Sequence, residues 1–389
     1  NGIDEIRNAT KSKNGGFIIV GLTTSDDGDI SQFYGFWDVW VFKIDQNGTL
    51  EWEKTFGSTF IDEAGQIIET SDNGYIVAMT SLEDSSGNCY CQNYYPGHAD
   101  FWIVKLDSLR NIIWQKCYGG TYDEISRCVL EINDGYIILG STNSNDGVVS
   151  GFHGVPGDPN YYDLWLLKID KQGDMIWQKC LGGSKNESSR IIQLTDDSTY
   201  MIIGETQSDD GNVSGHHPAN GIGTTSDIWM VELNEEGEII WQQCIGGSQD
   251  ETVYHGVVYN GEKNYIKAGN SDRPADGDVQ CEFHGGNSSD FWVFELNDSA
   301  TSVSDMQNDD IEVSIYPNPA QEYVIIDWSQ SINIKGLRIF DVYGKQMEQI
   351  FPGPTQNRYK WNCAHISRGI YFLQVLAIDG VFCDKIIIQ

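Results

Sequence analysis

The stretch DLWLLKIDKQGDMIWQKCLGG, from Asp163 to Gly183, occurs in closely similar form four times in this chain. The other copies are DVWVFKIDQNGTLEWEKTFGS from Asp38, DFWIVKLDSLRNIIWQKCYGG from Asp100 and DIWMVELNEEGEIIWQQCIGG from Asp227. The interval between the first Asp and the second Trp is identical in every copy, as between Asp163 and Trp177. This constant spacing indicates a structural repeat that has received no insertion.

The repeat has a nearly constant period. Its D-x-W landmarks begin at Asp38, Asp100, Asp163, Asp227 and Asp290, at almost equal intervals along the chain. A second landmark precedes each of them, a segment that opens on Asp-Glu, as at Asp123-Glu124, or in the fourth copy on Asn186-Glu187. The segments are rich in Val, Ile, Tyr, Phe and Trp and are separated by turn signals such as Asn73-Gly74. Each copy is therefore predicted to contain four short strands.

The third strand of the repeat is apolar on both faces. In the second copy Trp102, Val104 and Leu106 share one face, and Phe101 and Ile103 share the other. A strand of this kind lies between two other layers. The sequence therefore predicts an all-β fold in which about five four-stranded blades, each a repeat of about 63 residues, form a β-propeller. A solenoid of β-arches is the alternative.

The repeats are offset at the two ends of the sequence. The fifth copy passes from its third strand, DFWVFELN at 290–297, into a polar segment, and the first copy lacks the strand that should precede Asp4. We expect an N-terminal strand to be missing and the ring to close by borrowing a strand, which leaves no open sheet edge. The predicted domains are a propeller at 1–297, a linker at 298–309 and a small β-sandwich at 310–389.

Four motifs in the C-terminal region point to a known kind of domain. They are VSIYPNPAQEYVIID, LRIFDVYGKQM, ISRGIYFLQV and the terminal KIIIQ. In this order they closely resemble the C-terminal (type A) sorting domain of type IX secretion substrates from Bacteroidetes. The resemblance implies an Ig-like β-sandwich, export by the type IX secretion machinery and a final location outside the cell or on its surface. The repeat region is similar to repetitive propeller-like regions of such secreted proteins.

An apolar alternation in this region predicts the core of the sandwich, formed by Ile339, Val342, Tyr371, Leu373 and Val375. A purely structural Ig-like module without a sorting role is the alternative interpretation of the same residues.

The charge of the chain restricts its partners. Lysine and arginine number 24 against 57 acidic residues, which gives a net charge of -33. Residues 310–389 hold 8 acids and 7 bases, so nearly all of the excess lies in residues 1–309. This charge disfavours nucleic acids and anionic membrane surfaces as partners. The sequence also has no apolar run of the roughly 18 residues that a membrane span requires.

The connections between second and third strands are predicted to bind a ligand, which we expect to be a glycan or a protein. They span 22–37, 80–99, 141–162, 205–226 and 270–289, so they are longer than ordinary hairpin loops, and they carry aromatic, acidic and histidine side chains. Equivalent loops of successive blades fall on one rim, and long loops are often functional. The candidate ligand-binding residues are Trp37, Tyr94, Tyr95, His153, Tyr161, Tyr162, His216 and His284. The alternative is that these side chains pack the loops together or are polar surface residues.

Asp-Gly turns in the same loops are candidate calcium sites. The candidate oxygen ligands are Asp26, Asp27, Asp29, Asp209, Asp210, Asp276 and Asp278. Calcium prefers carboxylate and carbonyl oxygens at such spacings, although the closing Glu of an EF-hand is absent. Because Asp-Gly also forms ordinary turns, solvated turns are the alternative to calcium sites. No cofactor other than calcium is predicted.

No catalytic motif occurs in the sequence, so we expect a binding protein. An extracellular glycan-active enzyme with its site at the propeller mouth is the competing function. The Asp of D-x-W recurs five times, which favours a backbone anchor over a catalytic residue. The repeated Trp residues Trp52, Trp114, Trp177 and Trp241 are expected in the core.

The nine cysteines give two further expectations. Cys117, Cys180 and Cys244 occupy one repeat position that Thr55 fills in the first copy, which predicts small core residues. Local disulfides, Cys89 with Cys91 and Cys363 with Cys383, are compatible with an oxidising compartment.

Overall fold

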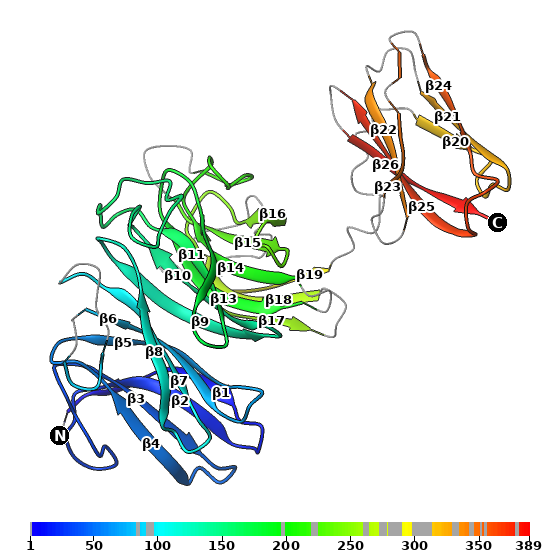
Figure 1. The fold of residues 1–389 in the computed structure, drawn as a ribbon. Helices are drawn as coiled ribbons and strands as arrows, with labels where there is room; N and C mark the ends of the chain where they lie inside the picture. Colours follow the sequence, from blue (N-terminus) through cyan, green and yellow to red (C-terminus); the bar gives the residue numbers. More distant parts are fainter. Residues whose placement is uncertain are drawn as a thin grey trace. The chain divides into compact units, whose positions relative to one another are not determined.

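The computed structural model describes residues 2–82, 86–90, 97–195, 199–218, 225–259, 264–271, 278, 290–297, 313–328, 334–341, 346–350, 352–353, 356–377 and 381–389. The chain divides into two compact units, residues 1–296 and 297–389. Both consist of antiparallel β-sheets (Figure 1). Throughout these residues there is no helix, and hence none long and apolar enough to cross a membrane. The all-β expectation is confirmed.

The first unit contains five successive sheets, one for each sequence repeat, in which neighbouring strands are consecutive in the chain. Sheet 1 consists of β1 (Asp4–Lys11), β2 (Phe17–Thr23), β3 (Asp38–Ile44) and β4 (Leu50–Phe56). Sheet 2 consists of β5 (Asp62–Glu69), β6 (Tyr75–Ser81), β7 (Asp100–Leu106) and β8 (Ile112–Tyr118). Sheet 3 consists of β9 (Glu124–Ile132), β10 (Gly135–Thr142), β11 (Asp163–Asp170) and β12 (Met175–Leu181). Sheet 4 consists of β13 (Glu187–Leu194), β14 (Tyr200–Thr206), β15 (Asp227–Leu233) and β16 (Ile239–Ile245). Sheet 5 has three strands in the described residues, β17 (Glu251–Tyr259), β18 (Asn264–Ser271) and β19 (Asp290–Asn297).

Successive sheets pack face to face, as the two-sided apolar strands predict. Trp102 and Val104 of β7 pack in one core cluster with Val39 and Val41 of sheet 1. The opposite face of β7 packs, through Phe101, in a second cluster with residues of sheet 3. All seven residues of β7 are buried. The same alternation continues between sheets 3 and 4 and between sheets 4 and 5. Sheets 2, 3 and 4 therefore each supply one apolar face to the sheet before them and one to the sheet after them.

The first strand of each sheet makes most of the contact with the preceding sheet. β5 contacts β1, β2 and β3, and β9 contacts β5, β6 and β7. β13 in turn contacts β9, β10 and β11, and β17 contacts β13, β14 and β15. The first strands consequently follow one another along the stack of sheets.

The tryptophans of the repeat differ in burial from the prediction. Trp102, Trp165 and Trp229 of the D-x-W motif are fully buried. Trp52, Trp114, Trp177 and Trp241 pack against the core clusters but are only partly buried. The reason is their strand: the motif Trp lies on the third strand, which has a partner on each side, whereas the later Trp lies on the fourth strand, at the sheet edge. The expectation that the later Trp residues form the core was therefore correct only in part.

The second unit is a sandwich of two sheets. One consists of β20 (Val313–Tyr316), β21 (Tyr323–Trp328) and β24 (Arg358–Asn362). The other consists of β22 (Ile334–Asp341), β23 (Gln346–Ile350), β25 (Gly369–Ala377) and β26 (Val381–Ile388). The predicted core residues Ile339, Tyr371, Leu373 and Val375 are buried between them, and Val342 lies outside the described residues.

The Pro-Asn-Pro motif ties the start of this unit to its last strand. Asn318 donates a hydrogen bond from Nδ2 to the Lys385 carbonyl oxygen at 2.7 Å, and its Oδ1 accepts one from Ile387 N at 2.8 Å. The Pro-Asn-Pro motif is thus hydrogen-bonded directly to the last strand of the chain.

The cysteines correct three expectations. Cys180 and Cys244 are buried and free, as predicted for core residues, but Cys117 is disulfide-bonded. Cys89 is a buried thiol whose Sγ lies 3.7 Å from Ser81 Oγ, and Cys363 is buried and free, so the pairings Cys89–Cys91 and Cys363–Cys383 were wrong. Proximity in the sequence does not suffice for a disulfide, because the bond needs a narrow range of Cα separation and Cβ direction.

Candidate functional site

The Asp of D-x-W anchors the loop that precedes it. Asp163 Oδ2 accepts a hydrogen bond from His153 N at 3.1 Å and lies 2.6 Å from His153 Nδ1. Asp227 Oδ2 accepts one from His217 N at 2.9 Å and lies 2.7 Å from His217 Nδ1. In sheet 1 the backbone N–H of Tyr34 fills the same place at Asp38. The prediction of a backbone anchor is confirmed, and the histidines complete it.

The structure distributes the predicted ligand-binding residues over different environments. Trp37 is half-buried, and His153 is exposed beside Asp163. His216 is buried, with Nε2 2.8 Å from the Thr225 carbonyl oxygen. Tyr161 packs against the core cluster between sheets 2 and 3, whereas Tyr162 lines a pocket. Tyr94, Tyr95 and His284 lie outside the described residues. The loops therefore do not bring these side chains together into one cluster within the described part.

The Asp-Gly turns hold successive sheets together. Asp210 Oδ1 accepts the Ser184 N–H at 2.7 Å, in the turn that connects sheet 3 to sheet 4. Asp146 Oδ1 accepts the Thr121 N–H at 2.7 Å in the preceding turn, and Asp278 Oδ2 accepts the Gly246 N–H at 3.3 Å in the following one. Each loop is thus hydrogen-bonded to the turn that precedes its own sheet, a contact that we call the loop clasp.

The remaining candidate calcium ligands stay predictions. Asp26, Asp27, Asp29 and Asp209 are exposed, and Asp276 lies outside the described residues. The described part of the chain contains no group of three or more His, Cys, Asp or Glu side chains arranged to hold a metal ion.

Replacement of Asp210 by Ala tests the loop clasp against the calcium alternative. We expect the free energy of unfolding to fall by about 1 kcal/mol, because the Ser184 N–H loses the carboxylate that joins its turn to the loop of Asp210. The melting temperature should fall equally in calcium and in chelator. A melting temperature that calcium raises in the parent protein but not in Asp210→Ala would instead establish Asp210 as a calcium ligand.

A second acidic residue is buried beside the D-x-W acid in several repeats. Glu187 accepts hydrogen bonds from Gly183 N at 2.9 Å and from Thr206 Oγ1 at 2.8 Å. Asp163 Oδ1 and Glu187 Oε2 both approach Gly182, where an added Cβ would lie 2.6 Å from the first and 2.3 Å from the second. Both carboxyl groups are fully buried, so only glycine leaves room for the pair.

The same pairing recurs around Gly119, with Asp100 and Glu124, and around Gly246, with Asp227 and Glu251. Burial raises the pKa of Glu124 to about 8 and that of Glu187 to about 7. Burial also raises the pKa of Asp163 to about 6. Asp163 Oδ1 has no hydrogen-bond partner within the described ranges, and a proton shared with Glu187 would satisfy it. These acids form a repeated structural element, and sequence inspection missed it because its members are far apart in the chain.

The first strand of every sheet contains a β-bulge at the same position. In β9 the pairing with β10 passes from Ser126 directly to Cys128, so Arg127 is the extra residue. Arg7 in β1 and Arg190 in β13 are skipped in the same way, as are Gly65 in β5 and Tyr254 in β17. A bulge re-aims the extra residue and bends the strand. Three of the five sheets therefore present an arginine at one equivalent point.

These arginines line a hollow of about 570 Å³, which we call the inner hollow. Its walls are the first-strand segments 7–9, 64–66, 127–128 and 189–193. A neighbouring cavity of about 290 Å³, the lateral pocket, shares Arg127, Ser189 and Arg190 with it. Pro159 and Tyr162 from the loop of sheet 3 form part of the lateral pocket. One of the predicted loop aromatics thus lies beside the arginines.

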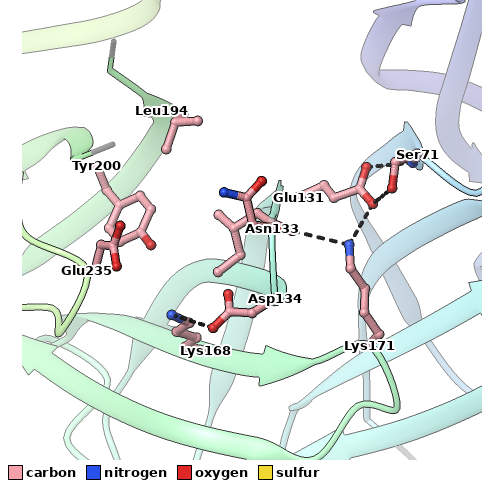
Figure 2. A pocket seen from close by; sticks show the side chains of 10 residues that line it. Ser71, Glu131, Asn133, Asp134, Lys168, Lys171, Leu194, Tyr200 and Glu235 are labelled. Carbon is pink, nitrogen blue, oxygen red and sulfur yellow. Dashed lines mark hydrogen bonds and ion pairs between the residues drawn. The ribbon is translucent and has the colours of Figure 1, made fainter. Parts of the chain in front are cut away.

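A third cavity, of about 350 Å³, lies among the hairpin turns at the opposite strand ends (Figure 2). Its two lysines pair with two of its three acidic side chains. Lys171 Nζ is 2.7 Å from Glu131 Oε1, and Lys168 Nζ is 3.1 Å from Asp134 Oδ2. Ser71 Oγ donates a further hydrogen bond to Glu131 Oε1 at 2.7 Å. This network explains the residues without a ligand.

Comparison with solved structures gives only distant similarities. The extracellular domain of a protein described as a one-component system from B. thetaiotaomicron is 10% identical at a TM-score of 0.26, and this chain spans only 57% of its length. The extracellular domain of a hybrid two-component system from the same organism is 8% identical at a TM-score of 0.18, with 98% of this chain and 68% of that one covered. Latent PorU from Porphyromonas gingivalis is 12% identical at a TM-score of 0.16. The match covers 99% of this chain and 34% of PorU. TM-scores this low establish no shared fold.

Among curated proteins no match was found. The model of the secretion system C-terminal sorting domain matches residues 314–389, which contain the Pro-Asn-Pro motif and the terminal strand that it contacts. Residues 314–389 are accordingly a sorting domain of the type IX secretion system, and the protein is secreted or held on the outer cell surface.

Proposed function

We propose that this chain is a secreted or surface-exposed binding protein whose first unit is a five-bladed β-propeller and whose ligand is a glycan. Two features support the propeller. Successive sheets pack face to face, and the first strands of four sheets surround one inner hollow. A solenoid stacks its sheets along a line, whereas strands that enclose a common hollow follow a curve around an axis.

The observation that carries the binding function is the lateral pocket. Tyr162 and Pro159 come from a long loop, whereas Arg127 and Arg190 come from the first strands of two sheets. Binding sites combine a few polar groups with aromatic surface, placed on loops that a rigid scaffold positions. The buried carboxyl pairs recur in several sheets and accept backbone N–H groups, which favours a binding protein over an enzyme.

A glycan array probed with the full chain tests this function, and replacement of Tyr162 tests its site. We expect Tyr162→Ala to weaken binding of the best glycan by about 1 to 2 kcal/mol, roughly 5- to 30-fold, because the ring is lost as a stacking surface. Tyr162→Phe keeps the ring and should bind nearly as well as the parent.

Tyr161→Ala is the matched control. This ring packs against a core cluster, so its loss should lower the melting temperature and leave the affinity unchanged. Equal binding by Tyr162→Ala and the parent protein would place the glycan site elsewhere.

A further inference from the structure

We infer that the inner hollow and the lateral pocket together bind an acidic saccharide, whose carboxylate lies on Arg127 and Arg190 and whose ring lies against Tyr162. The saccharide part of this inference rests on the proposed function. The charge of the ligand rests on the arginines alone.

The distribution of arginine is the first argument. Residues 1–296 contain five arginines within a strongly acidic chain. Three of them, Arg7, Arg127 and Arg190, occupy the bulge position, and all three line the inner hollow. The residues that line this hollow in the described structure include no Asp or Glu. The lateral pocket includes one acid, Glu187, whose carboxyl group is fully buried and accepts hydrogen bonds from Gly183 N and Thr206 Oγ1. A hollow with cationic walls and no carboxylate selects an anion.

The bulge itself does not need a basic residue. Sheet 2 forms the same bulge with Gly65 in the equivalent position, and its strands pair as regularly as those of the neighbouring sheets. The long basic side chains of the other sheets therefore need an explanation beyond the fold, and a bound anion supplies one.

Arg190 is held in place for such a contact. Its Nε and Nη2 donate to the two carboxylate oxygens of Glu205 at 3.1 and 3.0 Å. Glu205 also accepts hydrogen bonds from Ser188 Oγ at 2.9 Å and Val253 N at 3.1 Å. This mostly buried carboxylate fixes the guanidinium plane, and Nη1 has no partner in the described ranges. A pre-oriented guanidinium loses little entropy when it binds a second carboxylate.

Arg127 differs from Arg190 because it is exposed and makes no ion pair with any described residue. An unpaired guanidinium can bind a carboxylate through two parallel hydrogen bonds, which are stronger than neutral ones. Arg7 lies on the far strand of the hollow and is 3.1 Å from Glu5, so its charge is partly offset. We therefore assign the carboxylate to Arg127 and Arg190.

The remaining walls fit a sugar better than a simple inorganic ion. Asn8, Gln66 and Gln193 line the inner hollow with amides, which recognise hydroxyl groups. The volume of about 570 Å³ falls within the range of small-molecule sites. Tyr162 and Pro159 add apolar surface beside the arginines. A nucleic acid carries many phosphates and would be repelled by the net charge of -33.

Calorimetric titration of the full chain with three probes tests the inference. The probes are a short oligogalacturonate, its methyl ester, which keeps the rings but loses the charge, and malonate, which keeps the carboxylates but lacks the ring. We expect the oligogalacturonate to bind at least roughly ten-fold more tightly than the ester. Arg127→Gln should cost roughly ten-fold or more in oligogalacturonate affinity. Arg127→Lys keeps the charge but loses the paired N–H donors of the guanidinium, so its affinity should lie between those of Arg127→Gln and the parent.

Arg110→Gln is the matched control, since it removes the same charge from the β7–β8 turn, and it should bind as the parent does. Equal binding of acid and ester, unaffected by Arg127→Gln, would overturn the acidic ligand and leave the glycan function intact. Arginine-dependent binding of malonate without any saccharide would overturn the glycan function and support the anion site. Failure of every acidic probe to bind would overturn the inference.

Discussion

A reporter that carries its own signal peptide and residues 297–389 at its C-terminus is expected to reach the surface of a type IX-competent cell. The sorting domain is a compact unit with its own core, so it should fold on the reporter. The same fusion should stay in the periplasm of a strain without the type IX machinery. Surface labelling together with cell fractionation measures the difference, which should be nearly all or none.

A pair of variants separates folding of the sorting domain from mere attachment. Leu373 is fully buried, and Leu373→Asp places an unpaired charge in the core, which costs more than a small domain can offset. This variant should abolish surface display. Arg368 is exposed, so Arg368→Ala should be displayed like the parent. Display of the reporter without residues 297–389 would contradict the assignment.

The buried carboxyl pairs predict that the protein is more stable at pH 5 than at pH 8. The unfolded chain releases these protons near pH 4, whereas the folded chain keeps them up to a pKa of about 6 at Asp163, about 7 at Glu187 and about 8 at Glu124. Between these limits the native state binds more protons, so the free energy of unfolding falls as the pH rises. Each pKa unit corresponds to about 1.4 kcal/mol. We expect the melting temperature at pH 5 to exceed that at pH 8 by about 5 °C or more.

Glu187→Gln is the variant that tests the origin of this effect. The amide resembles the protonated carboxyl group in shape and does not titrate, so the variant should lose part of the pH dependence and be at least as stable as the parent at pH 8. The neighbouring Asp163 is unchanged in this variant, and so is His153, whose Nδ1 lies 2.6 Å from Asp163 Oδ2. Asp174→Asn, at an exposed side chain, is the control and should keep the parental profile. Parallel profiles for Glu187→Gln and the parent would exclude the pair as the source.

The strands and sheets were predictable because each repeat shows the same alternation of apolar residues and the same turn signals at constant spacing. The alternation of Phe101, Trp102 and Ile103 predicted a strand buried on both faces, and the structure places β7 between two core clusters. The terminal motifs predicted the sorting domain for the same reason, since each of them is a strand or a turn of one small unit.

The candidate site was less predictable, because its residues meet only across sheets. Arg127 and Arg190 belong to different repeats. The sequences of the first strands differ between repeats, so the one-residue shift at the bulge could not be recognised from their pattern of apolar and polar residues. Sequence alignment on the acidic pair also equated Asp62 with Asp123, whereas the structure pairs Asp62 with Ser81 and Glu124 with Thr142 at the equivalent place in the two sheets. Asp210 looked like a metal ligand because its partner, an amide group of a neighbouring turn, is 26 residues away in the chain.

The repeated bulge also has a consequence for how this kind of protein diversifies. At the bulge, one residue per repeat lies outside the regular pairing of the first strand: Arg7, Gly65, Arg127, Arg190 and Tyr254. Pairing on both sides of the extra residue is maintained whether it is Arg or Gly. At four of these positions, Arg7, Gly65, Arg127 and Arg190, the extra residue lines the inner hollow, so a single codon change there alters the lining without disturbing the strand register. Gene copies that differ at these positions alone would keep the same fold and export route while acquiring different ligand preferences.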